Sequence, residues 1–233
     1  MDIEFENLGA DEVLRWAVKE FRDKVVFSSS FSAEDIVITD MLVEVCRSEG
    51  IEPNIFTIDT GRLPNETYEV IDKVRERYGI NIRVYFPDYR EVEEMVEKYG
   101  MNLFYESVEK REMCCEIRKV KPLKRALNGM KAWITGLRRE QSITRKDVRK
   151  VEIDNIHGGI YKINPIVDWS DGQVWEYIKL KRLPYNSLYD RGYASIGCEP
   201  CTRAIRKIED IRAGRWWWES PEHRECGIHI KKI

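Results

Sequence analysis

Short apolar runs that alternate with helical patterns are the feature that most restricts how this chain can fold. Each run is too short for a core helix and is followed by a polar turn, which is typical of a buried strand. Strand, turn and helix follow one another in this order over the first two thirds of the chain. We therefore predict an α/β fold with a mostly parallel sheet and helices on both faces. The predicted strands are Val25–Phe27, Ile55–Ile58, Ile82–Phe86 and Ala132–Thr135.

The segments between the predicted strands carry helix signals. Pro64 stands where a helix is expected to begin, because proline suits the first helical position. Asp88 with Glu91, and Ser170 with Gln173, have the spacing of a capping box. We expect a helix after each of these three starts.

The pattern changes after residue 192. The segment 193–233 contains three cysteines, the run Trp216–Trp218 and several arginines. We predict a nucleotide-binding α/β domain over residues 1–192 and a cysteine-bearing C-terminal tail over 193–233 that packs on the same domain.

Composition excludes several classes of protein. The chain has 233 residues, of which 42% are hydrophobic and 34% are charged, and its net charge is −2. This charge is too small to suggest a nucleic-acid binder. We find no signal-peptide pattern and no apolar run near the roughly 20 residues that span a membrane. The sequence therefore predicts a soluble, cytoplasmic protein that binds neither membrane nor nucleic acid.

Two polar turns follow the first two predicted strands. They are Ser28–Ser32 and Asp59–Arg62. Ligands of open parallel sheets bind beyond the carboxyl ends of the strands, and a helix N-terminus there suits an anion. We expect the hydroxyls of the first turn to donate to phosphate oxygens, although ordinary capping turns have the same composition. The glycine pattern of a Walker A loop or a dinucleotide fingerprint is absent.

Four of the six cysteines form two close pairs. Cys114 and Cys115 are adjacent, and Cys198 and Cys201 form a CxxC motif. Four thiolates suit structural zinc or an iron–sulfur cluster, and the spacing leaves both open, together with unliganded thiols. Adjacent residues of a helix or strand do not point the same way, which favours the larger cluster over a single ion.

The other two cysteines receive different predictions. Cys46 ends an apolar helix stripe and is expected to be a buried small hydrophobe. Cys226 lies beside Gly227 and three residues before His229. A flexible neighbour and nearby positive charge suit a reactive thiolate, although a lone cysteine is more often inert packing.

Several segments together resemble the assimilatory adenylyl-sulfate reductases, relatives of the phosphoadenylyl-sulfate reductases. The resemblance extends over nearly the whole chain in family order, and no single motif decides it. The segments are Ser28–Asp35, Asp59–Leu63, Cys114-Cys115 with Arg118-Lys119, Thr135–Ser142, Cys198–Thr202, Arg212–Trp218 and Glu225–His229.

This resemblance implies an adenine-nucleotide α-hydrolase-like fold and an activity in sulfate assimilation and cysteine biosynthesis. It implies that Cys226 attacks the sulfur of adenylyl sulfate, that AMP leaves, and that thioredoxin or a similar dithiol releases sulfite from the S-sulfocysteine. The cysteine pairs Cys114, Cys115, Cys198 and Cys201 would hold a 4Fe-4S cluster. The substrate-binding residues implied are Ser30, Phe31, Ser32, Asp59, Thr60, Gly61, Arg62, Lys119, Arg138, Arg212, Arg215 and His229.

Some alternatives stay open at this point. The substrate could be the 3′-phosphorylated nucleotide, alone or alongside adenylyl sulfate, and a homo-oligomer is compatible with the sequence. An ATP pyrophosphatase would require a Ser-Gly-Gly loop, which this sequence lacks. A non-catalytic zinc-binding module would give Cys226 no role. The basic residues near the first cysteine pair are most simply a solvated helix face, with Lys119 the exception by resemblance. They are Lys110, Arg111, Arg118, Lys119, Lys121, Lys124 and Arg125.

Overall fold

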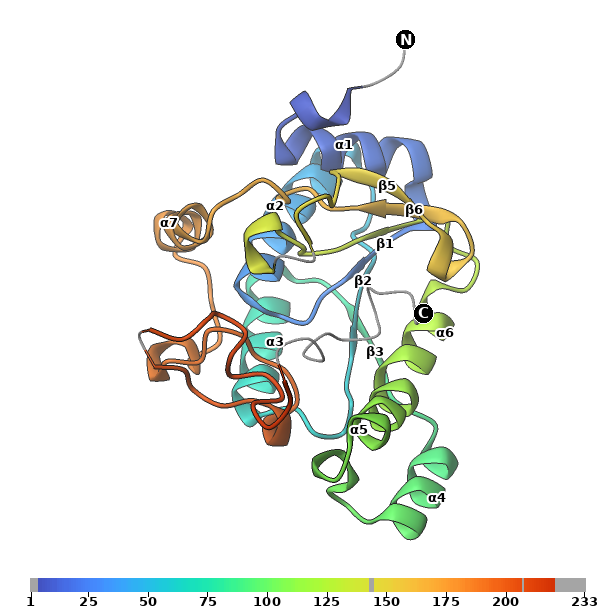
Figure 1. Ribbon diagram of the computed structural model, residues 1–233. Coiled ribbons are helices and arrows are strands. Elements are labelled where there is room, and N and C mark those ends of the chain that lie inside the picture. Colours follow the sequence, from blue (N-terminus) through green and yellow to red (C-terminus); the bar gives the residue numbers. More distant parts are fainter. Residues whose placement is uncertain (1–3, 143–144, 207, 221–233) are drawn as a thin grey trace. The chain divides into compact units, whose positions relative to one another are not determined.

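The structure is a computed structural model that describes residues 4–142, 145–206 and 208–220. Figure 1 shows the arrangement of its helices and strands. Within the described residues, no helix combines the length and the apolar character that crossing a membrane requires.

Helices and strands alternate along most of the chain. The strands are β1 (Val25–Ser28), β2 (Ile55–Ile58), β3 (Ile82–Tyr85), β4 (Ala132–Ile134), β5 (Val151–Asp154) and β6 (Ile160–Ile163). The α-helices are α1 (Ala10–Phe21), α2 (Ala33–Glu49), α3 (Asn65–Tyr78), α4 (Tyr89–Tyr99), α5 (Val108–Cys115), α6 (Lys121–Leu127) and α7 (Asp171–Lys181). A π-helical turn, Glu116–Val120, joins α5 to α6.

The sheet has six strands in the order β3-β2-β1-β4-β6-β5. Strand β1 pairs in parallel with β2 and with β4, and β4 pairs in parallel with β6. Only β5 is shown to run antiparallel, along β6 at one edge. The predicted α/β class with a mostly parallel sheet is therefore confirmed.

Two strands escaped the sequence analysis. The segments of β5 and β6 mix apolar and charged residues, and a single 3-10 turn (Asn155–His157) rather than an α-helix joins them, so they break the alternation that revealed the other four. The four predicted strands lie within one residue of their observed ends. Of the two predicted capping boxes, one is formed as a capping box and the other is not. Ser170 and Gln173 form a capping box, whereas Asp88 caps α4 by accepting from the Arg90 amide.

The chain forms two compact units, each assembled from separate segments. The first unit comprises residues 1–57, 66–83 and 129–187, and the second comprises 58–65, 84–128 and 188–233. In the first unit, the first three residues of β1 are buried, and α2 presents buried residues on most of its surface. In the second unit, Met95, Leu103 and Phe104 pack with Trp216 and three of the paired cysteines.

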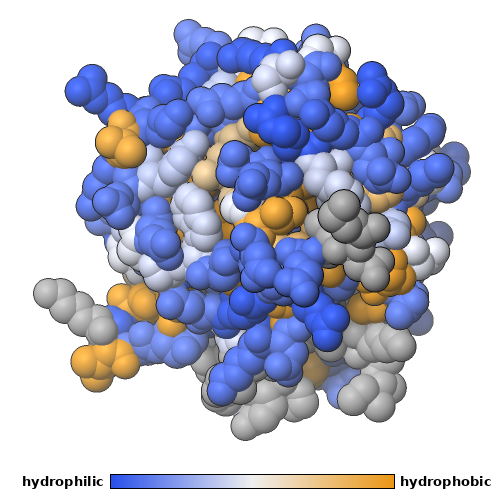
Figure 2. Space-filling model, turned by 90° about the horizontal axis from the view of Figure 1, so that it is seen from above, coloured by the Kyte–Doolittle hydropathy of each residue, from blue (hydrophilic) through white to orange (hydrophobic). Residues whose placement is uncertain are grey.

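The surface seen in Figure 2 is mostly hydrophilic, and its apolar residues lie in small groups rather than in one broad patch. Such scattered apolar residues are ordinary on a folded protein. This face therefore gives no sign of an extensive apolar interface.

A pair of matched substitutions tests the placement of the core. Val26 in β1 is 1% exposed, and Val84 in β3 is 43% exposed. We expect Val26→Ala to lower the free energy of unfolding by about 2–3 kcal/mol, because two buried methyl groups and their packing are lost. Val84→Ala should change it by less than about 0.5 kcal/mol. Urea denaturation measures both, and equal losses would contradict this account of the sheet.

Candidate functional site

The turn after β1 has an unusual backbone. Phe31 has a φ of 57°, a conformation that bulky side chains rarely adopt, and its ring is buried. Such a residue persists only where its surroundings hold it. The turn leads directly into α2, so the predicted nucleotide-binding segment lies at the carboxyl end of β1, as expected.

A buried carboxylate holds this turn in place. Oδ2 of Asp35 accepts from the Ser30 amide at 2.6 Å and from the Ser30 hydroxyl at 2.7 Å. The Phe31 amide donates to the Ser29 hydroxyl at 3.2 Å. Burial raises the pKa of Asp35 to about 6, although these hydrogen bonds act in the opposite direction. The donors of Ser30 and the Phe31 amide are therefore engaged inside the protein.

Gly136 allows the turn after β4 to approach Asp35. A Cβ built on Gly136 would lie 2.3 Å from Oδ1 of Asp35, closer than any real contact. Only glycine therefore fits here, since the clash would be with a buried side chain that is already fixed by Ser30.

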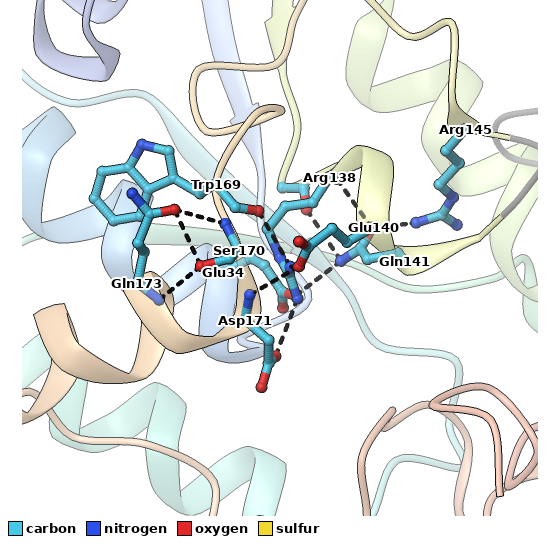
Figure 3. Close-up of polar contacts among 10 residues, drawn as sticks. Glu34, Arg138, Glu140, Gln141, Arg145, Trp169, Ser170, Asp171 and Gln173 are labelled. Carbon is cyan, nitrogen blue, oxygen red and sulfur yellow. Dashed lines mark hydrogen bonds and ion pairs between the residues drawn. The ribbon is translucent and has the colours of Figure 1, made fainter.

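Arg138 lies at the centre of a network of carboxylates in the same unit (Figure 3). Its Nε donates to Glu34 at 3.0 Å, and its terminal nitrogens lie 3.1 Å from Asp171 and 3.4 Å from Glu140. The backbone carbonyl of Trp169 accepts a further hydrogen bond. The guanidinium is 1% exposed. The structure therefore places Arg138 as an internal tie between turns, and its predicted contact with substrate stays a prediction.

The second predicted turn lies in the second unit. Gly61 has a φ of 71°, and its amide donates to Asp59 at 2.7 Å. The carbonyl of Thr60 accepts from Arg118 at 2.6 Å. Arg62 donates to the carbonyl of Met101 and lies over the ring of Phe104, so part of its guanidinium is already used in contacts within the protein.

The structure brings all four paired cysteines to one cavity of the second unit. The cavity encloses about 360 Å³ of space, part of it open to solvent. None of the four forms a disulfide. Among the described residues, no three histidine, cysteine or acidic side chains converge as ligands of a single metal ion. The lining residues are Arg62, Phe104, Arg111, Cys114, Cys115, Arg118, Lys119, Cys198, Pro200, Cys201 and Trp216.

The adjacent cysteines face the cavity together because of helical spacing. Arg111, Cys114 and Cys115 stand at i, i+3 and i+4 of α5, the spacing of one helix face, and Arg118 and Lys119 follow in the π-helical turn. Neighbouring residues differ by about 100° around the axis, so both can border a wide stripe. The expectation that adjacent cysteines point apart was therefore too strict.

The charges of the cavity act on its thiols. Burial raises the pKa of Cys198, but Lys119, a 3.2 Å hydrogen bond with Thr60 and two arginines together lower it below its ordinary value. Burial and then the charge of Cys198 raise the pKa of Cys201 to about 12. One thiolate is thus favoured and further thiolates are opposed, unless a bound metal group supplies positive charge.

Two cavity cations correct the sequence analysis. Arg111 and Arg118 are 2% and 8% exposed, so they are not part of a solvated helix face. Nε of Arg118 is buried and finds no hydrogen-bond partner among the described residues. A buried donor of this kind requires an acceptor, and the sulfur atoms of a metal–sulfur group would provide one. The donor set and the cations therefore fit a four-thiolate cluster.

The segment after Cys201 is anchored beside the cavity. The guanidinium carbons of Arg111 and Arg215 lie 4.8 and 4.7 Å from the ring centroid of Trp216. Arg111 also donates to both oxygens of Glu219, at 2.9 and 2.8 Å. The Trp216 amide donates to the carbonyl of Cys201. This arrangement joins the tail to both cysteine pairs without any bound group.

The remaining predicted site residues are placed as follows. Lys119 lines the cavity, and Arg212 lies half-buried in a turn where its amide donates to Asp210. Cys226 and His229 lie outside the described residues. Sequence reasoning missed Asp35, Arg111 and Glu219. The helical spacing of Arg111 with Cys114 was a usable signal, whereas nothing in the sequence pairs it with Glu219.

Comparisons with known proteins agree on one family. Residues 24–204 match the phosphoadenosine phosphosulfate reductase domain. A protein of Allochromatium vinosum named adenosine 5′-phosphosulfate reductase is 50% identical over 96% of this chain and 85% of its own length. A protein of the same name from Burkholderia cepacia is 52% identical over 93% of this chain and 84% of its own length.

Solved structures support the fold. Phosphoadenylyl-sulfate reductase from Candida auris superposes with a TM-score of 0.71 and 31% identity, over 85% of this chain and 91% of that one. FMN adenylyltransferase from Candida glabrata reaches a TM-score of 0.60 at 13% identity, over 86% of this chain and 66% of that one. The predicted adenine-nucleotide α-hydrolase-like fold is confirmed by these likenesses.

A double-mutant cycle tests the Arg111–Glu219 pair. Both side chains are at most 3% exposed, so removing either partner leaves a buried charge. We expect Arg111→Met and Glu219→Leu each to lower the free energy of unfolding by about 3–5 kcal/mol. The double variant should recover most of that loss, because no unpaired charge remains. Chemical denaturation measures the cycle, and additive losses would show that the pair is not coupled.

Proposed function

The chain belongs to the phosphoadenosine phosphosulfate reductase family, and from this premise we propose that it reduces adenylyl sulfate to sulfite and AMP. The resemblance predicted from the sequence is thereby confirmed. The observation that carries the proposal is the cavity where four cysteines and four cations meet, in a chain about half identical to proteins named for this reaction.

Adenylyl sulfate is favoured over its 3′-phosphorylated relative by the degree of similarity. The proteins named adenosine 5′-phosphosulfate reductase are 50% and 52% identical to this chain, whereas the Candida auris phosphoadenylyl-sulfate reductase is 31% identical. The 3′-phosphorylated substrate is therefore the second candidate.

The proposed chemistry has two displacements. The thiolate of Cys226 attacks the sulfur of adenylyl sulfate, an S–S bond forms, and the S–O bond breaks with its electron pair leaving on AMP. A thiolate of thioredoxin, or of a similar dithiol, then attacks Sγ of Cys226 and expels sulfite. The second thiol of the dithiol resolves the mixed disulfide and restores the Cys226 thiolate.

The cations of the second unit suit the charge that develops on the leaving group. Lys119 and Arg215 both lower the pKa of Cys198, so their positive charges act at the cavity. Preorganised cations stabilise an anionic leaving group without having to reorient. The proposed roles of Arg212 and His229 in holding the phosphosulfate follow from the family resemblance.

We propose that Cys114, Cys115, Cys198 and Cys201 hold a 4Fe-4S cluster. When bound, such a cluster supplies a negatively charged, polarisable group that ties the two cysteine pairs together. Arg111, Arg118 and Lys119 would balance its charge, and the buried Nε of Arg118 would donate to it.

Metal analysis tests the cofactor. We expect anaerobically purified protein to hold about four irons and four sulfides per chain, the content of one cubane cluster. Cys198→Ser should lose the iron, whereas Cys46→Ser should keep it, because Cys46 is buried on α2 and is not among the residues that line the cavity. Stoichiometric zinc without sulfide would contradict the proposal.

Mass spectrometry tests the nucleophile. Given adenylyl sulfate without a dithiol, the protein should react once, release one AMP and gain about 80 Da, the mass of one sulfonate group on a covalent intermediate. Peptide mapping should place the added mass on Cys226, and thioredoxin should release it as sulfite. Cys226→Ser should keep its iron yet release no sulfite. Normal turnover by this variant would overturn the assignment.

A further inference from the structure

Asp35 is a buried charge whose purpose the proposed reaction does not explain. It is 4% exposed, and burial raises its pKa from 3.8 to about 6. Hydrogen bonds from Ser30 and Ser32 act against this rise, and the charge of Glu34 adds to it. The charged groups nearest to it are Glu34 on its own helix and, bound to Glu34, Arg138 from the turn after β4. Asp171 at the start of α7 completes that network.

An ionised carboxylate fixes the direction of the Ser30 hydroxyl. A carboxylate only accepts hydrogen bonds, so the hydroxyl proton of Ser30 must point toward Oδ2 at 2.7 Å. Ser30 itself is exposed, so a ligand can reach its Oγ, whose lone pairs are not used by the bond to Asp35. The Ser30 amide is held by the same carboxylate oxygen.

The surroundings disfavour an anion at this turn. The donors of Ser30 and the amide of Phe31 are already engaged, and two carboxylates stand in the first turn of α2. Glu34 is matched by Arg138, which it shares with Asp171 and Glu140. Three carboxylates therefore surround one guanidinium, and the charge of Asp35 adds to the excess. The expectation that these hydroxyls donate to phosphate oxygens does not suit this arrangement.

We propose that Asp35 is a positioning residue that makes the Ser30 hydroxyl an acceptor, so that it binds an O–H or N–H donor of the nucleoside rather than a phosphate oxygen. This inference rests on the proposed function, since it concerns how the adenine nucleotide is held. The donor is a ribose hydroxyl or the adenine amino group. Gly136 contributes to this arrangement, because the absence of a Cβ leaves room for the buried Oδ1 of Asp35.

We expect the ionised Asp35, which orients the Ser30 hydroxyl, to lower the free energy of unfolding. Its pKa in the folded protein lies above the ordinary value, so the ionised form is disfavoured by folding. The cost is absent below pH 3.8, grows between pH 3.8 and 6, and is fully present above pH 6. Asp35→Asn should therefore raise the melting temperature at pH 7.5 and weaken nucleotide binding. A merely structural residue would lower both.

Calorimetry on the anaerobically purified holoprotein tests the direction of the hydroxyl. Ser30→Ala should weaken AMP and adenosine by the same factor, about two- to tenfold, because the lost contact is to the nucleoside. The analogues 2′-deoxy-AMP, 3′-deoxy-AMP and inosine monophosphate each lack one possible donor to Ser30. The analogue that lacks the actual donor should bind wild type and Ser30→Ala with the same affinity. These three analogues separate the ribose from the adenine as the source of the donor.

The outcomes separate this inference from the proposed function. Absence of AMP binding to wild type at any pH would refute the proposed function itself. If Ser30→Ala weakens AMP but not adenosine, the hydroxyl donates to the phosphate and the inference is wrong. Equal losses for all three analogues would also overturn it, as would an Asp35→Asn variant that is less stable than wild type at pH 7.5.

Discussion

The second unit depends on how positive charge is arranged around buried sulfur. Burial acts to raise the pKa of Cys114, Cys198 and Cys201, because a thiolate loses its hydration there. Lys119 and Arg118 of the π-helical turn, with Arg215 and a hydrogen bond with Thr60, offset this penalty for one thiol, Cys198, and leave Cys201 strongly opposed to ionisation. Helix α5 provides the first cysteine pair, and the π-helical turn that continues it provides Arg118 and Lys119. Two ligands and two of the compensating charges therefore reach the cavity from one continuous helical segment.

The first unit shows the opposite balance. Three carboxylates share the buried guanidinium of Arg138, and Asp35 has hydrogen bonds from Ser30. Buried groups of this kind fix the backbone through directional hydrogen bonds rather than through net attraction. The left-handed conformation of Phe31 follows from this constraint, since the turn is held on one side by Asp35 and on the other by its own buried ring.

The sequence predicted what depends on local pattern and missed what depends on partners distant in the chain. Four strands and the capping box at Ser170 are local features, and each was found. Strands β5 and β6 were missed because they are half-polar and joined by a short 3-10 turn rather than an α-helix. The cysteine pairs were recognised, but Arg111 was assigned to a solvated face because its partner Glu219 lies over 100 residues away. Asp35 was noted only as part of a motif, because the sequence does not show that a carboxylate in the first turn of a helix is buried.

The π-helical turn between α5 and α6 makes chain length part of the site's geometry. Its wider winding contains one residue more than a regular helix would need over the same span. Loss of a single residue between 116 and 120 would restore regular winding and rotate everything beyond it by about 100° relative to α5. Lys119 and α6 would then present different faces, although every remaining side chain was unchanged. At this point of the fold, an evolving relative can alter the surroundings of the cysteines by deletion as effectively as by substitution.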